Sequence, residues 1–187
     1  MKKNISYLSI VLFSMLIILL TTACSLTQTP TDKVKSFLNQ YSNLSDNVLT
    51  DLDTKVASEN LSSELQKVYT DVLKRQYKNI KYEIKDEKID GDKATVITKI
   101  TVYDLYKIDK DSLNYMNNNL SEFNNTNGVY DDNMFNKYRL NEMLKTDITV
   151  DYEIEFHLNK VEGEWILESP DRETLEKIHG LYNYDSE

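Results

Sequence analysis

The spacing of apolar residues changes near residue 80, and this change limits the possible folds more than any other feature of the chain. Between residues 31 and 80 the apolar residues recur every three or four positions, as on one face of a helix. Beyond residue 80 they alternate with polar residues, first over residues 80–102 and most regularly over residues 148–158, as in half-buried strands. The turn signal Asp90-Gly91 divides the first stretch, and Glu162-Gly163 follows the second. The sequence therefore predicts helices followed by two antiparallel hairpins.

Three helices are predicted before the first hairpin. The first has Thr31 as its N-cap, the second is capped by Ser45, and the third begins after Asn60. A short closing helix over residues 171–179 is expected to end at Gly180, because glycine is the usual residue after a helix C-terminus.

A helical insertion at about residues 109–145 separates the two hairpins, with an Asn-rich loop at residues 124–128. The predicted fold class is therefore α+β: N-terminal helices packed on a curved antiparallel sheet of two long hairpins, with the helical insertion between the hairpins. Trp165 and the apolar stripe of residues 148–158 are expected to form the sheet's part of the core, facing the helix at residues 61–73.

The N-terminus of this 187-residue chain has the pattern of a signal peptide. Lys2 and Lys3 precede an apolar run over residues 7–20, and small residues lead from there to Cys24, the only cysteine. The run is shorter than the roughly 20 apolar residues of a membrane-spanning helix. We expect residues 1–23 to be the signal peptide; an uncleaved anchor helix, or a cleaved signal that leaves a free thiol, are the alternatives.

Residues 20–24, Leu-Thr-Thr-Ala-Cys, resemble the lipobox of bacterial lipoproteins. The resemblance implies that Cys24 is diacylated on sulfur and becomes the first residue after cleavage. Two acyl chains, at roughly 0.8 kcal/mol per buried CH₂ group, would hold the protein on membrane lipid. The expected localisation is the extracytoplasmic face of the cell membrane. Residues 24–31 would form a polar tether, and residues 32–187 a single domain.

Charge and composition exclude several classes of function. The chain has 31 acidic and 22 basic residues, a net charge of -9, which argues against nucleic acid as a partner. One cysteine and four glycines leave no disulfide framework, no thiolate zinc cluster and no glycine-rich phosphate loop. Residues 86–92 superficially resemble a calcium loop, but Lys88 and Ile97 stand where two ligands are needed. We expect neither a metal nor a cofactor.

The candidate catalytic residues lie on one predicted strand. Asp151, Glu153, Glu155 and His157 alternate with the apolar stripe and so share one face. Such a face could line a pocket, with carboxylate and imidazole acting as acid and base. It could equally be the wet side of an open sheet, and we favour this second interpretation, in which none of the four is catalytic.

Two other patterns carry weaker functional interpretations. Glu176 and His179 have the spacing of a carboxylate–imidazole metal motif, but no second copy exists, so His179 is expected to be solvated near a helix C-terminus. The chain is rich in tyrosine, with 13 residues, some of which could form a binding surface for a ligand or carbohydrate; the candidates are Tyr103, Tyr106, Tyr115 and Tyr130.

The order of elements over residues 31–169, above all the closing hairpin at residues 154–167, resembles the nuclear transport factor 2-like family, a cystatin-like cone fold. This resemblance implies a fold that hosts isomerases, ligand carriers and non-catalytic scaffold modules. We expect a membrane-anchored, non-catalytic binding or scaffold module at the cell envelope, with an envelope protein, a wall polymer or a small ligand as its partner. The alternative is a small pocket enzyme of isomerase or dehydratase type that uses the acids of residues 148–158.

Overall fold

The computed structural model describes residues 28–186. The predicted signal peptide and Cys24 lie outside the described residues. None of the helices within residues 28–186 combines the length and the hydropathy that crossing a membrane requires.

Three helices form the N-terminal part: α2 (Pro30–Ser42), α3 (Asp46–Ser58) and α4 (Ser63–Lys78). Helix α2 begins two residues earlier than predicted, because Thr29 rather than Thr31 is its N-cap. The Thr29 side chain accepts a hydrogen bond from the backbone of Asp32, whose carboxylate accepts one from the backbone of Thr29 in return. The amide of Thr31 instead donates to Glu87 at 2.9 Å, which ties the start of α2 to the sheet.

The sheet has four antiparallel strands in the order β1-β2-β3-β4. They are β1 (Lys81–Asp90), β2 (Lys93–Tyr103), β3 (Thr149–Val161) and β4 (Glu164–Leu167), which form the two predicted hairpins. The second hairpin is lopsided, since β4 has only four residues. Ile148, expected to begin the apolar stripe, instead precedes β3 and is 46% exposed.

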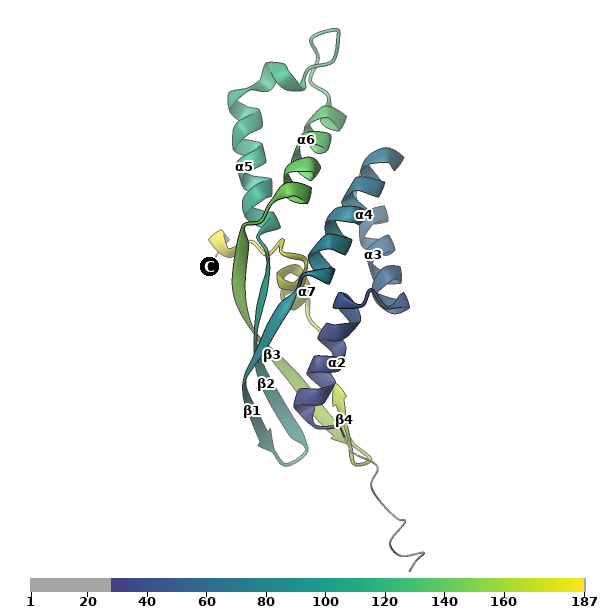
Figure 1. The fold of residues 1–187 in the computed structure, drawn as a ribbon, viewed down its shortest axis with the longest axis vertical. Coiled ribbons are helices and arrows are strands. Elements are labelled where there is room, and N and C mark those ends of the chain that lie inside the picture. The colour runs from purple at the N-terminus through teal and green to yellow at the C-terminus, as the bar shows by residue number, and fades with distance from the viewer. Residues whose placement is uncertain (1–27, 187) are drawn as a thin grey trace, which may run out of the picture.

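The helical insertion lies between β2 and β3 and consists of α5 (Leu105–Asn118), the 3-10 helix η1 (Leu120–Phe123) and α6 (Asp132–Lys145). We call residues 105–145 the arm. It begins four residues before the predicted boundary, because the carboxylate of Asp104 accepts a hydrogen bond from the amide of Lys107 and so caps α5. The arm extends beyond the sheet, at the end of the molecule opposite the start of α2 (Figure 1).

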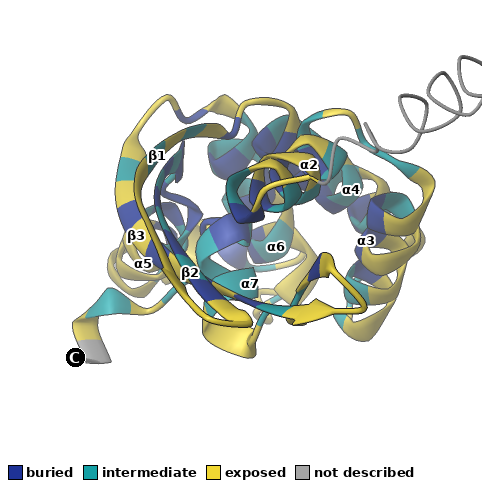
Figure 2. Ribbon diagram, turned by 90° about the horizontal axis from the view of Figure 1, so that it is seen from below, coloured by how far each residue is buried: buried dark blue, intermediate teal, exposed yellow. Residues whose placement is uncertain are grey.

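The apolar face of the sheet curves around the helices, and its other face is open (Figure 2). We predicted that this apolar face would meet α4, and that prediction is wrong. Helix α2 lies between them: it packs on β1, β2 and β4 as well as on α4, and its Phe37 ring meets Phe156 edge to face at 5.7 Å. Helix α4 packs mainly against α3 and α6. Trp165 is buried as expected, at 7% exposed, on β4 under α2.

The closing helix α7 (Arg172–His179) is joined to α4 and β2 by one buried amide. The side chain of Gln76 is fully buried and donates to the carbonyl oxygens of Tyr103 and Ile178, each at 3.3 Å. Its oxygen accepts from the amide of Tyr103 at 3.0 Å. Gly180 ends α7 in the left-handed conformation, with φ at 73°, beside this amide. These contacts fix where His179 stands relative to α4.

Candidate functional site

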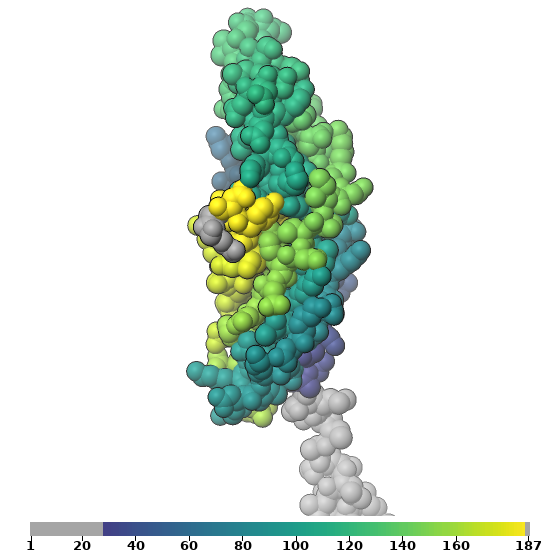
Figure 3. Space-filling view, turned by 90° about the vertical axis from the view of Figure 1, so that its left-hand side faces the viewer, coloured from purple at the N-terminus to yellow at the C-terminus, as the bar shows by residue number. Residues whose placement is uncertain are grey.

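The four strand residues selected from the sequence do share one face of β3. Asp151, Glu153, Glu155 and His157 are all exposed, on the outer face of the curved sheet, away from the helices. Figure 3 looks onto this side of the molecule, where the strands form the surface below the C-terminal segment. The face is convex, so it does not enclose a substrate.

Lysines on neighbouring strands interleave with these acids. The strand register places Lys99 opposite Glu153, and its ammonium group reaches Asp151 at 2.6 Å. The hydroxyl of Thr101 donates to the same carboxylate, also at 2.6 Å. The hydrogen bond from Lys99, followed by the one from Thr101, lowers the pKa of Asp151. A general acid at neutral pH needs the opposite shift, so Asp151 is not prepared for that role.

A small recess of about 220 Å³ at the edge of the sheet includes two of the predicted residues, Glu155 and His157. The acids that complete it already have structural partners. Glu168 accepts a hydrogen bond from Asn159 at 2.6 Å, and Asp171 caps α7 by accepting from the amide of Thr174 at 2.8 Å. No cluster of three or more His, Cys, Asp or Glu side chains within the described part of the chain could hold a metal ion.

A second concavity, a groove of about 460 Å³, lies between α3 and α7, and it was not predicted. Its floor is aromatic and aliphatic, with polar groups on the α3 side. It is lined by Tyr41, Val48, Asp51, Thr54, Lys55, Ser58, Tyr77, Leu175 and His179. The groove therefore combines an apolar floor with one imidazole ring.

His179 is not the solvated helix-end residue that we predicted. Its Nδ1 atom is hydrogen-bonded to the hydroxyl of Tyr77 at 2.8 Å, and the two rings lie 5.6 Å apart. Burial, aided by the positive charge of Lys55, lowers the pKa of His179 to about 3. Glu176, its predicted companion, pairs with Arg172 at 2.7 Å instead.

The Tyr77–His179 pair is neutral on both sides at physiological pH. Burial raises the pKa of the Tyr77 hydroxyl well above its ordinary value, while that of His179 lies far below neutrality. A general base works best when its pKa is near the working pH, so this pair can donate and accept hydrogen bonds but is poorly placed to exchange protons. The groove is suited to binding rather than to acid–base chemistry.

The sequence offered no local signal for this pair. The two residues are 102 positions apart, and they meet only because α7 folds back onto α4. Tyr77 lies within the buried face of α4, where an aromatic residue is ordinary.

The third feature is an exposed apolar surface near the end of the arm. In the 19 residues from Ser112 to Tyr130 the only charged residue is Glu122, which accepts a hydrogen bond from Tyr115 at 2.9 Å. Large apolar side chains here and on the adjoining turn of α6 remain 38–60% exposed: Leu113, Tyr115, Leu120, Val129, Tyr130 and Met134. We call these six residues the arm tip.

Only two of the four predicted surface tyrosines belong to the arm tip, Tyr115 and Tyr130. Tyr103 instead lies under the guanidinium of Arg75, which is 3.8 Å from its ring centroid. Tyr106 donates to Asp185 at 3.0 Å near the C-terminal end of the described chain. The four tyrosines therefore do not form one surface.

No protein-family model, curated protein or solved structure matches this chain.

Proposed function

We propose that this protein is a lipid-anchored lipoprotein on the extracytoplasmic face of the cell membrane, and that its domain is a non-catalytic binding module of the cell envelope. The observation that carries the binding role is the position of the arm tip. Its exposed apolar side chains belong to the arm, which lies at the end of the molecule opposite the start of α2 (Figure 1).

The distance to the proposed anchor supports this orientation. Cys24 lies six positions before Pro30, the first residue of α2. Six extended residues span at most about 20 Å, so an acylated Cys24 would keep the α2 end of the domain near the membrane. The arm tip would then point away from the lipid surface, toward other envelope components.

A protein is the partner that the arm tip fits best. Exposed apolar patches on soluble domains commonly mark protein interfaces, whose centres are poor in charge and rich in Tyr and Met. The arm tip has this composition, on a chain that is otherwise strongly acidic. The pocket-enzyme alternative is less well supported, because its acids lie on the exposed convex face and the acids that complete the recess beside Glu155 and His157 already have structural partners.

Lipidation is tested by metabolic labelling with an alkyne palmitate. The wild-type chain should be labelled and should sediment with membranes, whereas Cys24→Ala should not be labelled. Equal labelling of both chains, or release of the wild-type protein into the medium, would contradict the anchor.

The binding role is tested by crosslinking and pull-down from intact cells with two matched variants. Leu120→Asp places a charge in the arm tip, where Leu120 is 53% exposed. Ile166→Asp places the same charge on the outer face of the sheet, at a residue that is 48% exposed. We expect Leu120→Asp to lose a specific protein partner and Ile166→Asp to retain it. If the wild type captures no protein, or if both variants behave alike, the arm tip is not the binding surface.

A further inference from the structure

A polar cleft of about 610 Å³ lies between the connection from α3 to α4 and the first turns of α6. None of its lining residues belongs to the arm tip or to the groove at His179, but it adjoins the arm tip at the first turn of α6, where Asp132 lies beside Tyr130. Its lining comes from two segments only, Glu59–Ser62 and α6, and consists of Glu59, Asn60, Leu61, Ser62, Asp132, Asn133, Asn136 and Arg139.

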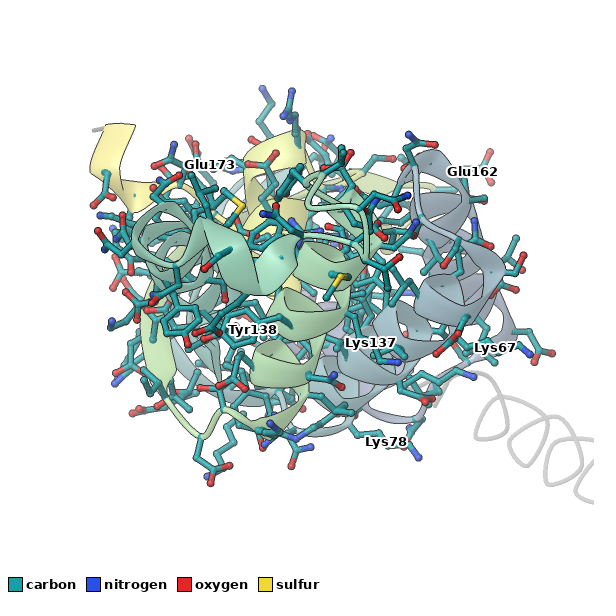
Figure 4. The ribbon with its side chains drawn as sticks, turned by 90° about the horizontal axis from the view of Figure 1, so that it is seen from above. Lys67, Lys78, Lys137, Tyr138, Glu162 and Glu173 are labelled. Carbon is teal, nitrogen blue, oxygen red and sulfur yellow. The ribbon has the colours of Figure 1, made fainter. Side chains whose placement is uncertain are left out.

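The α6 side of the cleft follows from helical spacing. Asn133, Asn136 and Arg139 are three residues apart and therefore project from neighbouring positions on one side of the helix. The facing wall is held in place because α6 packs along α4, and the ammonium of Lys137 meets Glu64 of α4 at 3.4 Å. Figure 4, which views the molecule from the arm end, shows Lys137 between these helices, whereas Tyr138 lies toward α5. The cleft is thus formed by elements that are already packed together.

Three amide side chains in the cleft are free to bind a ligand. Asn60, Asn133 and Asn136 line it, and their side chains make no hydrogen bond with another residue in the described range 28–186. Each amide offers two N–H donors and one carbonyl acceptor. Asn118 and Asn119 of α5, by contrast, are used internally: their side chains donate to carbonyl groups one turn earlier in that helix.

The charges in the cleft disfavour an anionic ligand. Glu59 and Asp132 contribute two carboxylates, of which Glu59 meets the ammonium group of Lys55 at 3.9 Å. The one cation among the lining residues, Arg139, is already paired with Asp109 at 2.9 Å. A phosphate or carboxylate ligand would therefore meet repulsion with no free positive charge to compensate it.

We infer that this cleft binds a neutral oligosaccharide. Sugar hydroxyls are both donors and acceptors, so they match free amides, carboxylate acceptors and the hydroxyl of Ser62 at the same time. A peptide also has amide groups, but its recognition depends on pockets for side chains. Seven of the eight lining residues are polar and only Leu61 is apolar, which favours a ligand rich in hydroxyls over a peptide.

The test is a titration of the full chain, in a detergent without a sugar headgroup, followed by ¹H–¹⁵N NMR of the asparagine side-chain amides. The probes are maltotriose, which offers hydroxyls alone, triacetylchitotriose, which adds acetamido groups, and tetra-alanine. We expect saturable shifts of the Asn133 and Asn136 side-chain signals with at least one saccharide and none with the peptide.

A double variant in α6 and a control variant in α5 test whether the saccharide binds in the cleft. The double variant Asn133→Ala/Asn136→Ala should raise the dissociation constant at least tenfold, and alanine is well tolerated in a helix, so the fold should persist. Asn117→Ala removes an exposed amide of α5 outside the cleft and should leave the dissociation constant unchanged. The inference is overturned if neither saccharide binds, if tetra-alanine binds instead, or if Asn117→Ala weakens binding as much as the double variant. Wild-type-like Trp165 fluorescence identifies the variants that remain folded.

Discussion

Replacing Gly180 by alanine should destabilise the domain far more than the same change at another glycine of similar backbone conformation. Gly180 has φ at 73°, and a Cβ atom placed there would lie 2.2 Å from the carbonyl oxygen of Tyr103 and 2.4 Å from Nε2 of Gln76. Gly163 has φ at 88° but open space around it, since a Cβ atom at that position would have no neighbour within 4 Å. Comparing Gly180→Ala with Gly163→Ala therefore separates the cost of backbone strain from the cost of the steric clash.

The expected magnitudes follow from these two environments. Alanine in the left-handed region costs roughly 1–2 kcal/mol, and this is all that Gly163→Ala should lose. Gly180→Ala loses the same amount and must also push α7 away from β2. The movement breaks the two hydrogen bonds that Gln76 donates to Tyr103 and Ile178, at about 1 kcal/mol each, and leaves a buried amide unsatisfied at about 1–3 kcal/mol more. The total for Gly180→Ala is about 4–7 kcal/mol.

Urea unfolding, monitored by the fluorescence of Trp165, measures both variants on one scale, because Trp165 is the only tryptophan and is buried. Gly180→Ala should lower the free energy of unfolding by about 3 kcal/mol or more beyond the decrease caused by Gly163→Ala. Equal losses for the two variants would refute the close approach of α7 to β2, and with it the placement of His179 against α4.

Three further predictions concern single side chains. Trp165→Ala should lower the free energy of unfolding, measured by circular dichroism, by about 3–5 kcal/mol. Ile166→Ala changes the next residue, which is 48% exposed, and should lower it by less than about 1 kcal/mol. Similar losses for the two variants would show that the register of β4 is wrong. Because the native pKa of His179, about 3, lies below the ordinary value of 6.5, the unfolded chain binds a proton first as the pH falls, and stability is lost between those two values. Between pH 7 and pH 5 the wild type should therefore lose about 2 kcal/mol more than His179→Asn, and parallel pH profiles would contradict the burial of this ring. In an NMR titration the pKa of Asp151 should lie below its ordinary value and should rise in Lys99→Ala; a carboxyl of this strand that titrates above about 6 would instead support the pocket enzyme.

Local patterns predicted most of the secondary structure. The alternation of residues 148–158 identified β3, because a strand with one buried face repeats every two residues. Glycine at turns was equally informative: Gly91, Gly163 and Gly180 all have positive φ, which other residues rarely adopt. These signals lie within a few residues of the structure they specify.

Contacts between distant segments were not predictable in the same way. Helices α2 and α4 both carry apolar stripes, and nothing in either stripe states which of them meets the sheet. Gln76 appears in the sequence as a polar interruption of the α4 stripe, yet it is fully buried because it satisfies backbone groups of β2 and α7. Apart from Tyr115 and Tyr130, the arm tip was also missed, since helical spacing of apolar residues indicates a buried face and does not show that a projecting helix pair lacks a partner on one side.

The distribution of ionisable groups bears on the choice between binding and catalysis. The acids of β3 stay in water and lie beside lysines, so Asp151 is held in its charged form. Asp104 is buried, but one of its oxygens accepts from the amide of Lys107 and the other from the hydroxyl of Tyr184, so both serve the fold. His179 lies in a groove, but its pKa keeps the ring neutral. A catalytic acid or base needs partial burial and a pKa near the working pH at once. The acids of β3 lack the burial, His179 lacks the pKa, and Asp104 is occupied by structural hydrogen bonds, which supports the proposal of a binding module.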